Sequence, residues 1–387
     1  MRLSTIAILA VAGLLLAGCA GPADDDSDNT TDSGSQSSTQ TQAQNPYAVP
    51  GTTTQVYGSG ATFPKPLIES WALQFAHDEP KVQVSYGGGG SGKGISDITK
   101  KDVFFGGTDA PMSTTEKAAA NGEHDTILQF PETLGVVAIV YNVNGVTAGL
   151  KLDGETLGKV YAGDIKFWDD AAITALNPGV TLPHNEIAIV YRSDSSGTTF
   201  VFTDFLVKTS PTFAGKITAA PNKKPDWTKS TATQLSGNGN DGVGSLVKTT
   251  PNSIGYVELA FVKSLNLKAA AMKSHDGAFL APTTDGAAKA AASKAGSLPA
   301  ADGDWSKVSI TDSAGDGAYP ISSFTYIMVY KELSSYGSKA TASQQDAFKA
   351  WMYWCLHDGQ DLSEPLGYAP LPASVVAIGD AALASLA

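Results

Sequence analysis

Three short stretches of the chain combine glycine with side-chain hydroxyl groups, and each lies where a strand pattern gives way to a helix pattern. They are GSGATF at 58–63, YGGGGSGKG at 86–94 and RSDSSGTT at 192–199. The first N–H groups of a helix have no acceptor within that helix, and the helix dipole adds partial positive charge at the same end. A turn of this kind can bind an anion. Three such turns therefore predict an anion site built from converging N–H and O–H donors.

Arg192 is the cation that we expect in this site. It follows the apolar run IAIVY, and its planar guanidinium suits the oxygens of an oxyanion. Asp194 comes two residues later and would orient Arg192 while offsetting part of its charge. The alternative is an exposed ion pair, which would contribute little to stability. The small hydroxyl and glycine positions beside the pair favour the site.

Asp109, in FFGGTDAPM, would place a carboxylate beside the bound anion. Like charges repel, so this arrangement favours an anion that still carries a proton and donates it to the carboxylate. Phosphate carries such a proton at neutral pH and sulfate does not, so one buried acceptor would select phosphate. The alternative is a turn acid before Pro111. The next helix already has the caps Ser113 and Glu116, so capping does not require Asp109.

The glycine-rich stretch also resembles parts of two enzyme motifs. Gly87, Gly92 and Lys93 fit the nucleotide-binding pattern G-x-x-x-x-G-K, but Gly94 stands where that pattern needs a metal-binding Ser or Thr. The nucleophile pattern G-x-S-x-G fails around Ser91 because Lys93 occupies its last position. A mobile glycine loop, with Ser91 as a helix N-cap, remains an alternative to the anion site.

The elements that would position these turns alternate between strand and helix patterns along the chain. This alternation predicts an α/β fold with mixed, mostly parallel sheets flanked by helices. About 335 residues follow position 51, which is more than one core accommodates and favours two lobes. In open α/β sheets, ligands bind outside the carboxyl ends of the strands, where these turns lie.

The N-terminus predicts export. Arg2 followed by the apolar run at 6–18 is typical of a secretory signal, so we expect residues 1–18 to be a signal peptide. The run is too short to span a bilayer, which needs about 20 residues. The sequence LAGC, ending at Cys19, resembles a lipobox and predicts a lipidated Cys19; an ordinary signal peptide that contains a cysteine is the alternative. Residues 19–51 are polar and predict a disordered linker.

Charge, cysteine count and histidine spacing argue against nucleic acid, a disulfide and a metal site. The net charge of −12 argues against nucleic acid. With Cys19 assigned to lipid, the other cysteine, Cys355, has no partner and is expected to be a buried, inert thiol. The five histidines show no metal-ligand spacing, and we expect neither a metal nor a cofactor.

Several motifs in series resemble one known family. GSGATFPKP, GTDAPM, RSDSSGTTFVF, GNGNDGV and SIGYVE occur in that order and are similar to the phosphate-binding proteins of bacterial phosphate ABC importers. The resemblance begins near Gln55 and continues to the C-terminus. It implies two α/β lobes, joined by a hinge, that close over the anion. Lobe 1 would consist of 52–133 plus 259–387, and lobe 2 of 134–258.

The resemblance also implies a set of phosphate-binding residues. The positions that match the family motifs are Thr62, Phe63, Ser91, Asp109, Arg192, Ser196, Gly197 and Thr198, with Asp194 in support. In this set Asp109 is the proton acceptor and Arg192 is the cation. The family often has glycine where Ser195 stands, which leaves the ligand class intact.

The function that the resemblance implies is a receptor for inorganic phosphate that performs no chemistry. It would be monomeric, anchored by lipid to the outer face of the cell membrane, in the periplasm or at the cell surface, and would deliver phosphate to a membrane ABC permease. Receptors for another protonated oxyanion such as arsenate are an alternative. A secreted phosphate-ester hydrolase and a surface adhesin or sensor are the others.

Overall fold

The computed structural model describes residues 45–146 and 149–387. The expected signal peptide, the lipidated Cys19 and the linker up to residue 44 lie outside the described residues. The strands are β1 (Thr54–Gly60), β2 (Val82–Gly87), β3 (Phe105–Thr108), β4 (Ile127–Asn142), β5 (Lys151–Leu152), β6 (Ala188–Arg192), β7 (Thr233–Gly237), β8 (Ser253–Glu258), β9 (Lys268–Ala269), β10 (Ala271–Lys273), β11 (Phe279–Leu280) and β12 (Ser322–Tyr330).

The helices alternate with these strands. The α-helices are α1 (Lys65–Asp78), α2 (Ser91–Thr99), α3 (Thr114–Asn121), α4 (Gly154–Ala162), α5 (Ala171–Leu176), α6 (Gly197–Thr209), α7 (Pro211–Lys216), α8 (Gly239–Thr249), α9 (Leu259–Leu265), α10 (Thr284–Ala292), α11 (Ala342–Leu356), α12 (Ser363–Leu366) and α13 (Ala373–Ala384). Three short 3-10 helices are η1 (Trp227–Lys229), η2 (Leu333–Lys339) and η3 (Asp358–Leu362).

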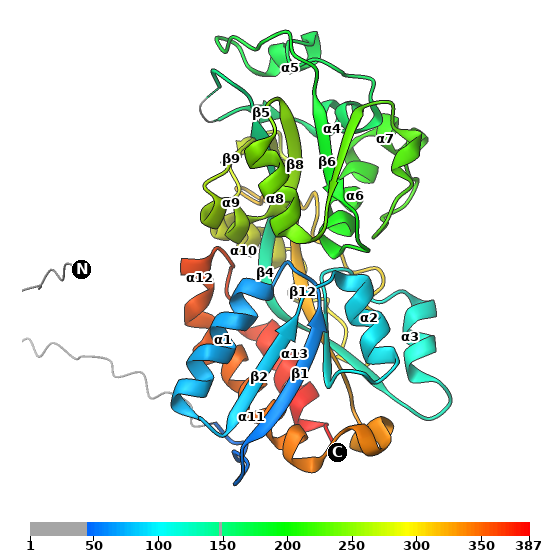
Figure 1. The fold of residues 1–387 in the computed structure, drawn as a ribbon, viewed down its shortest axis with the longest axis vertical. Helices are drawn as coiled ribbons and strands as arrows, with labels where there is room; N and C mark the ends of the chain where they lie inside the picture. Colours follow the sequence, from blue (N-terminus) through cyan, green and yellow to red (C-terminus); the bar gives the residue numbers. More distant parts are fainter. Residues whose placement is uncertain (1–44, 147–148) are drawn as a thin grey trace, which may run out of the picture. The chain divides into compact units, whose positions relative to one another are not determined.

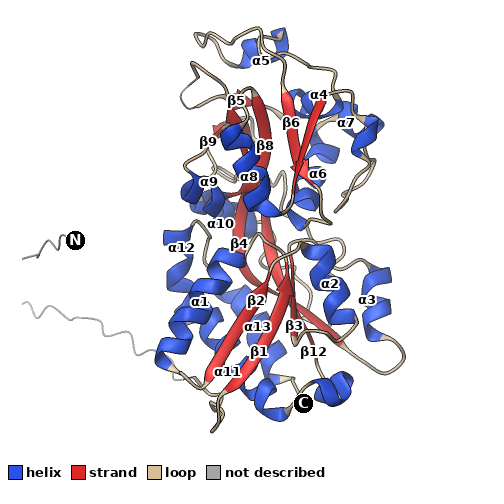
Figure 2. Cartoon of the chain, in the orientation of Figure 1, coloured by secondary structure: helices blue, strands red, loops and turns tan. Residues whose placement is uncertain are grey.

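One nine-stranded sheet organises the described residues, in the order β2-β1-β3-β12-β4-β8-β6-β7, with β9 added beside β4. Parallel pairs lie toward both ends, where β1 pairs with β2 and β3, and β6 pairs with β7 and β8. Antiparallel pairs through β12 and β4 join these two parts. Helices flank the strands (Figure 2). The predicted mixed α/β fold is confirmed.

Strand β4 connects the two parts of the sheet and thereby the two lobes (Figure 1). Its residues 127–136 pair with β12, and its residues 137–142 pair with β8. Almost every residue of β4 is buried, and its second half, LGVVAIVY, is a nearly continuous apolar run. We define lobe 1 as β2, β1, β3, β12 and the first part of β4, and lobe 2 as the second part of β4 with β8, β6 and β7.

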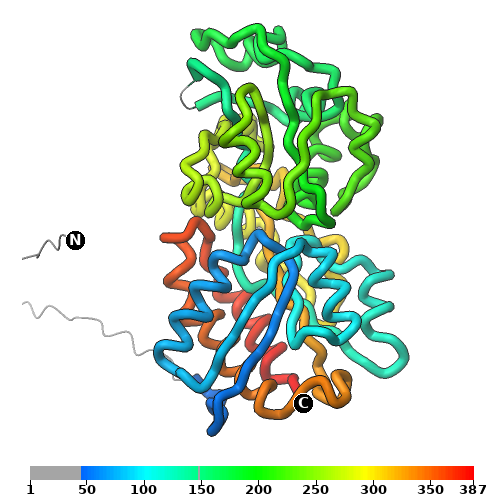
Figure 3. The backbone as a smooth tube through the Cα atoms, viewed as in Figure 1, coloured from blue at the N-terminus to red at the C-terminus, as the bar shows by residue number. Residues whose placement is uncertain are grey.

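Lobe 1 contains both early and late parts of the chain. In Figure 3 the blue segment with β1 and the orange and red segment with α11 and α13 lie in the same half. Helix α1 places Leu67, Ile68, Trp71 and Phe75 on its buried face, a helical spacing. Ser113 and Glu116 form the predicted capping box at the start of α3.

The lobe boundary that we expected after residue 258 is too early. Strand β9 pairs with the end of β4 at Val140 and Tyr141, and β10 pairs with β5, so both remain with lobe 2. The sequence after SIGYVE therefore does not return directly to lobe 1. Before it returns, the chain adds β9 beside the end of β4, where β9 pairs with backbone groups of β4.

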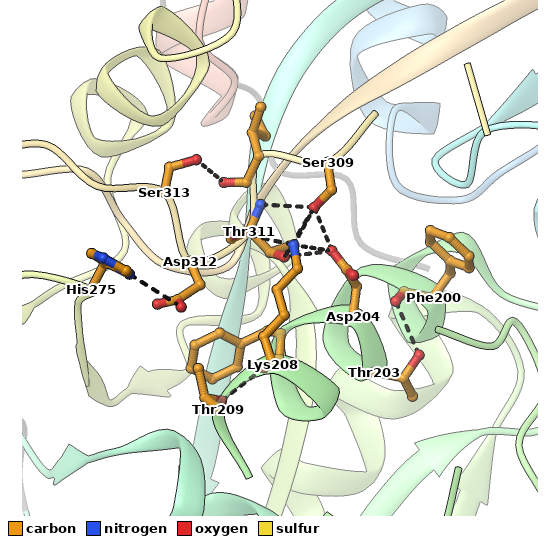
Figure 4. Close-up of polar contacts among 12 residues, drawn as sticks. Phe200, Thr203, Asp204, Lys208, Thr209, His275, Ser309, Thr311, Asp312 and Ser313 are labelled. Carbon is orange, nitrogen blue, oxygen red and sulfur yellow. Dashed lines mark hydrogen bonds and ion pairs between the residues drawn. The ribbon is translucent and has the colours of Figure 1, made fainter. Parts of the chain in front are cut away.

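The segment 309–312 also contacts lobe 2, as the close-up in Figure 4 shows. The carboxylate of Asp204, on α6, accepts hydrogen bonds from Ser309 Oγ and Thr311 Oγ1, each at 2.5 Å. Lys208, one turn later, donates to the same two hydroxyl groups at 2.6 and 2.7 Å. This cluster fixes the segment to α6 before the chain enters β12.

The linker ends earlier than we expected. Residues 45–50 were assigned to the disordered segment, but Asn45 Nδ2 donates to Ala350 O at 2.8 Å. The ring of Tyr47 packs edge-on against Tyr353, with ring centroids 5.8 Å apart. Tyr47 is the first large apolar residue after the polar segment, and it anchors this end of the chain to α11.

Two further observations concern the described residues. No helix among them combines the length and the apolar character that crossing a membrane requires. Cys355 is a buried free cysteine on α11, and burial raises the pKa of its thiol well above the usual value. The expectation that this thiol is buried is therefore confirmed.

Candidate functional site

The three predicted turns meet where lobe 1 faces lobe 2. One close approach is at Gly197, the first residue of α6. A Cβ atom built on Gly197 would lie 2.2 Å from Ser91 Oγ and 2.6 Å from Asp109 Oδ2. Glycine is therefore required at 197 by the close approach of lobe 1. The first turn joins the same cluster through Thr62, whose Oγ1 shares one amide donor with Thr198.

The start of α6 has the geometry of an anion-binding helix end. Ser196 is its N-cap and accepts a hydrogen bond from Thr199 N at 3.1 Å. The N–H of Ser196 donates to Lys223 O at 2.9 Å, which leaves the Ser196 hydroxyl hydrogen as its available donor. Ser196, Gly197 and Thr198 are all buried. These positions combine backbone N–H groups with hydroxyl groups at the positive end of a helix dipole.

Helix α2 begins in the same way, although Ser91 is not its cap. Gly90 holds the N-cap position, with φ of 92°, and Ser91 is the first helical residue. Ser91 Oγ accepts a hydrogen bond from Asp109 N at 3.0 Å. The alternative in which Ser91 serves only as an N-cap is therefore wrong.

Several backbone donors in this cluster have no acceptor among the described residues. Of the described residues, none accepts a hydrogen bond from the N–H groups of Phe63, Ser91, Gly197 and Thr198. The side chain of Phe63 itself is fully buried and packs against Tyr368, so its contribution to a site would come from its backbone. Buried N–H groups without acceptors are rare in proteins, and here they occur together.

Arg192 and Asp194 form a buried pair. Arg192 Nε donates to Asp194 Oδ1 at 2.8 Å, and Arg192 Nη2 donates to Asp194 Oδ2 at 2.5 Å. The side chains are 1% and 8% exposed, so the alternative of an exposed ion pair is wrong. Burial acts to raise the pKa of Asp194, but the hydrogen bonds and charge of Arg192 outweigh it and leave that pKa lowered. Arg192 Nη1 is directed to Thr198 Oγ1 at 3.2 Å.

Asp109 is the second buried carboxyl group of the cluster. It is 1% exposed, and its Oδ1 accepts a hydrogen bond from Thr325 Oγ1 at 3.1 Å. Burial raises the pKa of Asp109 to about 7, although the charge of Arg192 and the hydrogen bond from Thr325 act in the opposite direction. Its other oxygen faces the start of α6, among the free N–H groups.

Sequence analysis missed Asn240, near the start of α8. Its Nδ2 donates to Thr62 Oγ1 at 3.0 Å and to Thr198 Oγ1 at 3.2 Å, so it joins the first turn to the third. Its Oδ1 accepts from Glu258 N at 3.1 Å. The available signal was GNGNDGV, which follows a strand and starts a helix as the other three turns do.

The nucleotide-binding alternative for the glycine-rich stretch finds no support in the geometry. The Lys93 side chain forms an ion pair with Asp97, one turn along α2, and is 45% exposed. Asp97 also accepts from Ser59 Oγ at 2.6 Å. Lys93 is thus engaged on the surface of α2. In the part of the chain that the structure describes, no group of three or more His, Cys, Asp or Glu residues is placed to hold a metal ion.

The two lobes contact each other directly around the cluster. Gly92 N, on α2, donates to Ser195 O at 2.9 Å. Lys223 Nζ, from lobe 2, lies 2.6 Å from Glu116 Oε1 on α3. The lobes are therefore in contact at two places outside the cluster itself.

Comparisons with known proteins agree with this arrangement. A family model described as a PBP superfamily domain matches residues 37–358. The phosphate-binding protein PstS of Methanocaldococcus jannaschii is 35% identical over 330 residues, which cover 83% of this chain and 83% of that protein. The protein of the same name from Pasteurella multocida is 35% identical, over 83% of this chain and 87% of that protein. The chain belongs to this family of phosphate-binding proteins.

Solved structures of phosphate-binding proteins share this fold. A high-affinity periplasmic phosphate-binding protein, solved with bound phosphate, matches 85% of this chain and 93% of its own with a TM-score of 0.66 at 21% identity. The phosphate-binding protein from Stenotrophomonas maltophilia matches 86% and 93% with a TM-score of 0.65 at 20% identity. The family resemblance inferred from the motifs is confirmed. At these identities the solved structures support the fold, and the roles of individual residues rest on the contacts described above.

Proposed function

We propose that this protein binds inorganic phosphate with high affinity outside the cell membrane and delivers it to an ABC permease for uptake. One observation carries the proposal: a buried carboxyl group, Asp109, lies among free N–H donors and a buried arginine. Donors alone would suit any oxyanion. The added acceptor suits an oxyanion that carries a proton. The names and the coverage of the family members support the same conclusion.

The proposed binding residues are those predicted from the sequence, with Asn240 added. Backbone N–H groups of Phe63, Ser91, Gly197 and Thr198 would donate to the phosphate oxygens, together with nearby hydroxyl groups and Arg192. Hydrogen bonds to a charged group contribute on the order of 1.5–3 kcal/mol each. A set of them can outweigh the free-energy cost of removing phosphate from water and of ordering the two lobes. No step of the proposal requires bond making or breaking, so we propose a receptor and not an enzyme.

The discriminating group is Asp109. Monohydrogen and dihydrogen phosphate can donate a proton to its carboxylate, whereas sulfate at neutral pH has none to donate. A sulfate ion would leave the carboxylate and a sulfate oxygen facing each other without a hydrogen, at a cost of at least about 1–3 kcal/mol. Arsenate shares the protonation and shape of phosphate, and it is therefore the alternative ligand that this site admits.

The test is calorimetry with phosphate, arsenate and sulfate on the wild type and on Asp109→Asn. We expect Asp109→Asn to weaken phosphate binding by about 10- to 100-fold, because one charge-assisted hydrogen bond is lost. The same variant should bind sulfate measurably, since an amide donates to an oxygen that the carboxylate repels. Arg192→Ala should weaken the binding of both anions more than Asp109→Asn does, because it leaves Asp194 buried without its partner. Equal affinity of the wild-type protein for sulfate and phosphate would contradict the role of Asp109.

We also propose that Cys19 carries lipid and tethers a monomeric receptor to the outer face of the membrane. The support is the LAGC sequence and the polar segment that follows it. Mass spectrometry of the protein purified from its host tests this proposal. An unmodified mature N-terminus at a residue other than Cys19 would contradict it.

A further inference from the structure

Glu132 lies at an irregularity in the longest strand. Along the β4–β12 ladder, Thr325 pairs with Thr133, and Tyr326 pairs with Pro131. Glu132 has no partner in this register and is the extra residue of a β-bulge. Bulges redirect a side chain, and they occur often next to functional sites. Pro131 is tolerated here because the ladder is already interrupted.

The bulge directs the carboxyl group of Glu132 to the same hydroxyl that contacts Asp109. Glu132 is fully buried, and its Oε1 lies 3.3 Å from Thr325 Oγ1. The same Thr325 Oγ1 lies 3.1 Å from Asp109 Oδ1. A threonine hydroxyl has one hydrogen, so it can donate to only one of these two carboxyl groups. The carboxyl group that does not receive this hydrogen must supply one of its own for both contacts to be hydrogen bonds.

Among the described residues, the titratable groups around Glu132 are acidic or neutral. The titratable groups that act on it or feel it are Asp109, Tyr86, Cys355 and Tyr368. In the part of the chain that the structure describes, no Lys, Arg or His side chain acts on the pKa of Glu132, and its Oε2 is buried without a hydrogen-bond partner. Burying an isolated carboxylate is strongly unfavourable, and the group takes up a proton instead.

We propose that Glu132 is a protonated positioning residue that donates to Thr325, so that Thr325 donates to Asp109 and Asp109 stays the acceptor for the proton of phosphate. The inference rests on the proposed phosphate-binding function and assigns one proton to the pair of acids. Were that proton to reside on Asp109, the acceptor at the site would become a donor. Discrimination against sulfate would then be lost.

The titration behaviour of the two groups agrees with this assignment. Burial and the neighbouring charge of Asp109 raise the pKa of Glu132 to about 8. Burial raises the pKa of Asp109 to about 7, where Arg192 limits the increase. Because the charge of Arg192 favours the ionised form of Asp109 and no such charge acts on Glu132, the proton is held by Glu132. A bound phosphate adds negative charge and strengthens the retention of the proton on Glu132.

The consequence is a specific dependence of binding on pH. Above about pH 8 Glu132 ionises in the free protein and must recover its proton when phosphate binds. Each pH unit in this range then weakens binding by up to about tenfold. Glu132→Gln removes the titration while keeping a neutral donor of nearly the same shape at Thr325. The ratio of the wild-type Kd to the E132Q Kd should stay constant near neutral pH and rise by about tenfold between about pH 8 and about pH 9.5.

The experiment is phosphate calorimetry on both proteins between about pH 6 and about pH 9.5. Using the ratio of the two Kd values cancels the ionisation of phosphate itself. Glu123→Gln is the matched control, because Glu123 is 93% exposed and precedes the same strand. Its ratio to the wild type should not change with pH. Thr325→Val, which removes the shared hydroxyl, should bind phosphate more weakly and should gain measurable affinity for sulfate.

Three results would overturn the proposal. One is a constant ratio of wild type to E132Q across the whole pH range. Another is a folded E132Q that binds phosphate more than about tenfold more weakly at pH 7, since that would show Glu132 to be ionised in the complex. The third, which also applies if E132Q does not fold, is unchanged sulfate rejection in Thr325→Val. A wild-type protein that binds no phosphate would instead contradict the proposed function itself.

Discussion

Gly92→Ala tests whether phosphate is bound by closure of the two lobes. Gly92 is the second residue of α2, and its φ is not positive, so alanine fits the helical backbone there. Within the helix, alanine is favoured over glycine by up to about 1 kcal/mol. Across the lobe contact the effect is the opposite. A Cβ on Gly92 would lie 2.4 Å from Ser195 Oγ and 2.5 Å from Ser195 Cβ.

The magnitude follows from this overlap. Contacts this short do not occur between real side chains, so α2 and the Ser195 turn must move apart or distort. Overpacking of this kind costs typically about 1–3 kcal/mol. The overlap exists only when the lobes are in contact, so the cost falls on phosphate binding and not on folding of either lobe. Converted at about 1.4 kcal/mol per factor of ten, the Kd should rise by roughly 5- to 150-fold.

The assay combines phosphate calorimetry with thermal unfolding in the absence of phosphate. Gly92→Ala should lose affinity while its unfolding temperature stays equal to the wild type or increases. Ser195→Gly is the matched second variant, since it removes both atoms that the new methyl group would meet. Alone it should bind phosphate nearly as the wild type does. Combined with Gly92→Ala it should restore most of the lost affinity, as a double-mutant cycle would show.

Two outcomes would refute this reasoning. If Gly92→Ala binds phosphate with wild-type affinity, the contact between Gly92 and Ser195 is not part of the phosphate-bound form. If its loss of affinity persists in the double variant, the cause lies in α2 itself and not in the approach of the lobes. If Gly92→Ala unfolds at a lower temperature than the wild type in the absence of phosphate, the cause also lies in α2 and not in the approach of the lobes.

The ion pair between Lys223 and Glu116 should assist lobe contact modestly, because the two side chains are partly exposed, at 18% and 28%. Lys223→Met should therefore weaken phosphate binding by up to about fivefold. Calorimetry at low and high salt checks this, and a wild-type Kd that does not change with salt while Lys223→Met binds equally well would exclude the role. The phosphate-free protein should lose stability as pH rises from about 4.5 to about 8, because Glu132 and Asp109 have raised pKa values and keep protons that the unfolded chain has released. Urea unfolding across this range should show a falling free energy, with a shallower fall in E132Q, and a free energy that rises with pH would contradict the assignment.

The clustering of the turns that form the proposed anion site was predictable because the composition of each turn is local. A turn that joins a strand to a helix and consists of glycine and hydroxyl residues has its free N–H groups in the same place whatever the rest of the fold does. The structure accordingly brings the residues around Ser91, Asp109 and Gly197 into contact. Asn240 belongs to a fourth turn of the same composition. It was missed because its amide acts by joining Thr62 to Thr198, a relation that no local pattern contains.

Glu132 illustrates what the sequence cannot give. Glu132 is the acid of the stretch QFPETLG, and an acid inside an apolar strand is typical of the exposed face of a sheet. Only the register shift against β12 turns it toward Thr325, and the register is a property of two distant strands. The lobe boundary was missed for a similar reason, since β9 pairs with β4 through backbone groups that carry no side-chain signal.

The charges of the site explain how an acidic protein can bind an anion. The charge of Arg192 is largely compensated by Asp194, and with Glu132 neutral the pair of acids contributes one negative charge at most. The site therefore offers phosphate almost no net positive charge. Stabilisation must come from the dipoles of buried N–H and O–H groups, which act over short distances. The full sequence carries a net charge of −12, and screening beyond about 8–10 Å limits the effect of distant charges on the site. With so little net charge at the site, selectivity depends on where the protons are. Under the arrangement proposed above, the positions of single hydrogens on Asp109, Thr325 and Glu132 would decide which oxyanion is accepted.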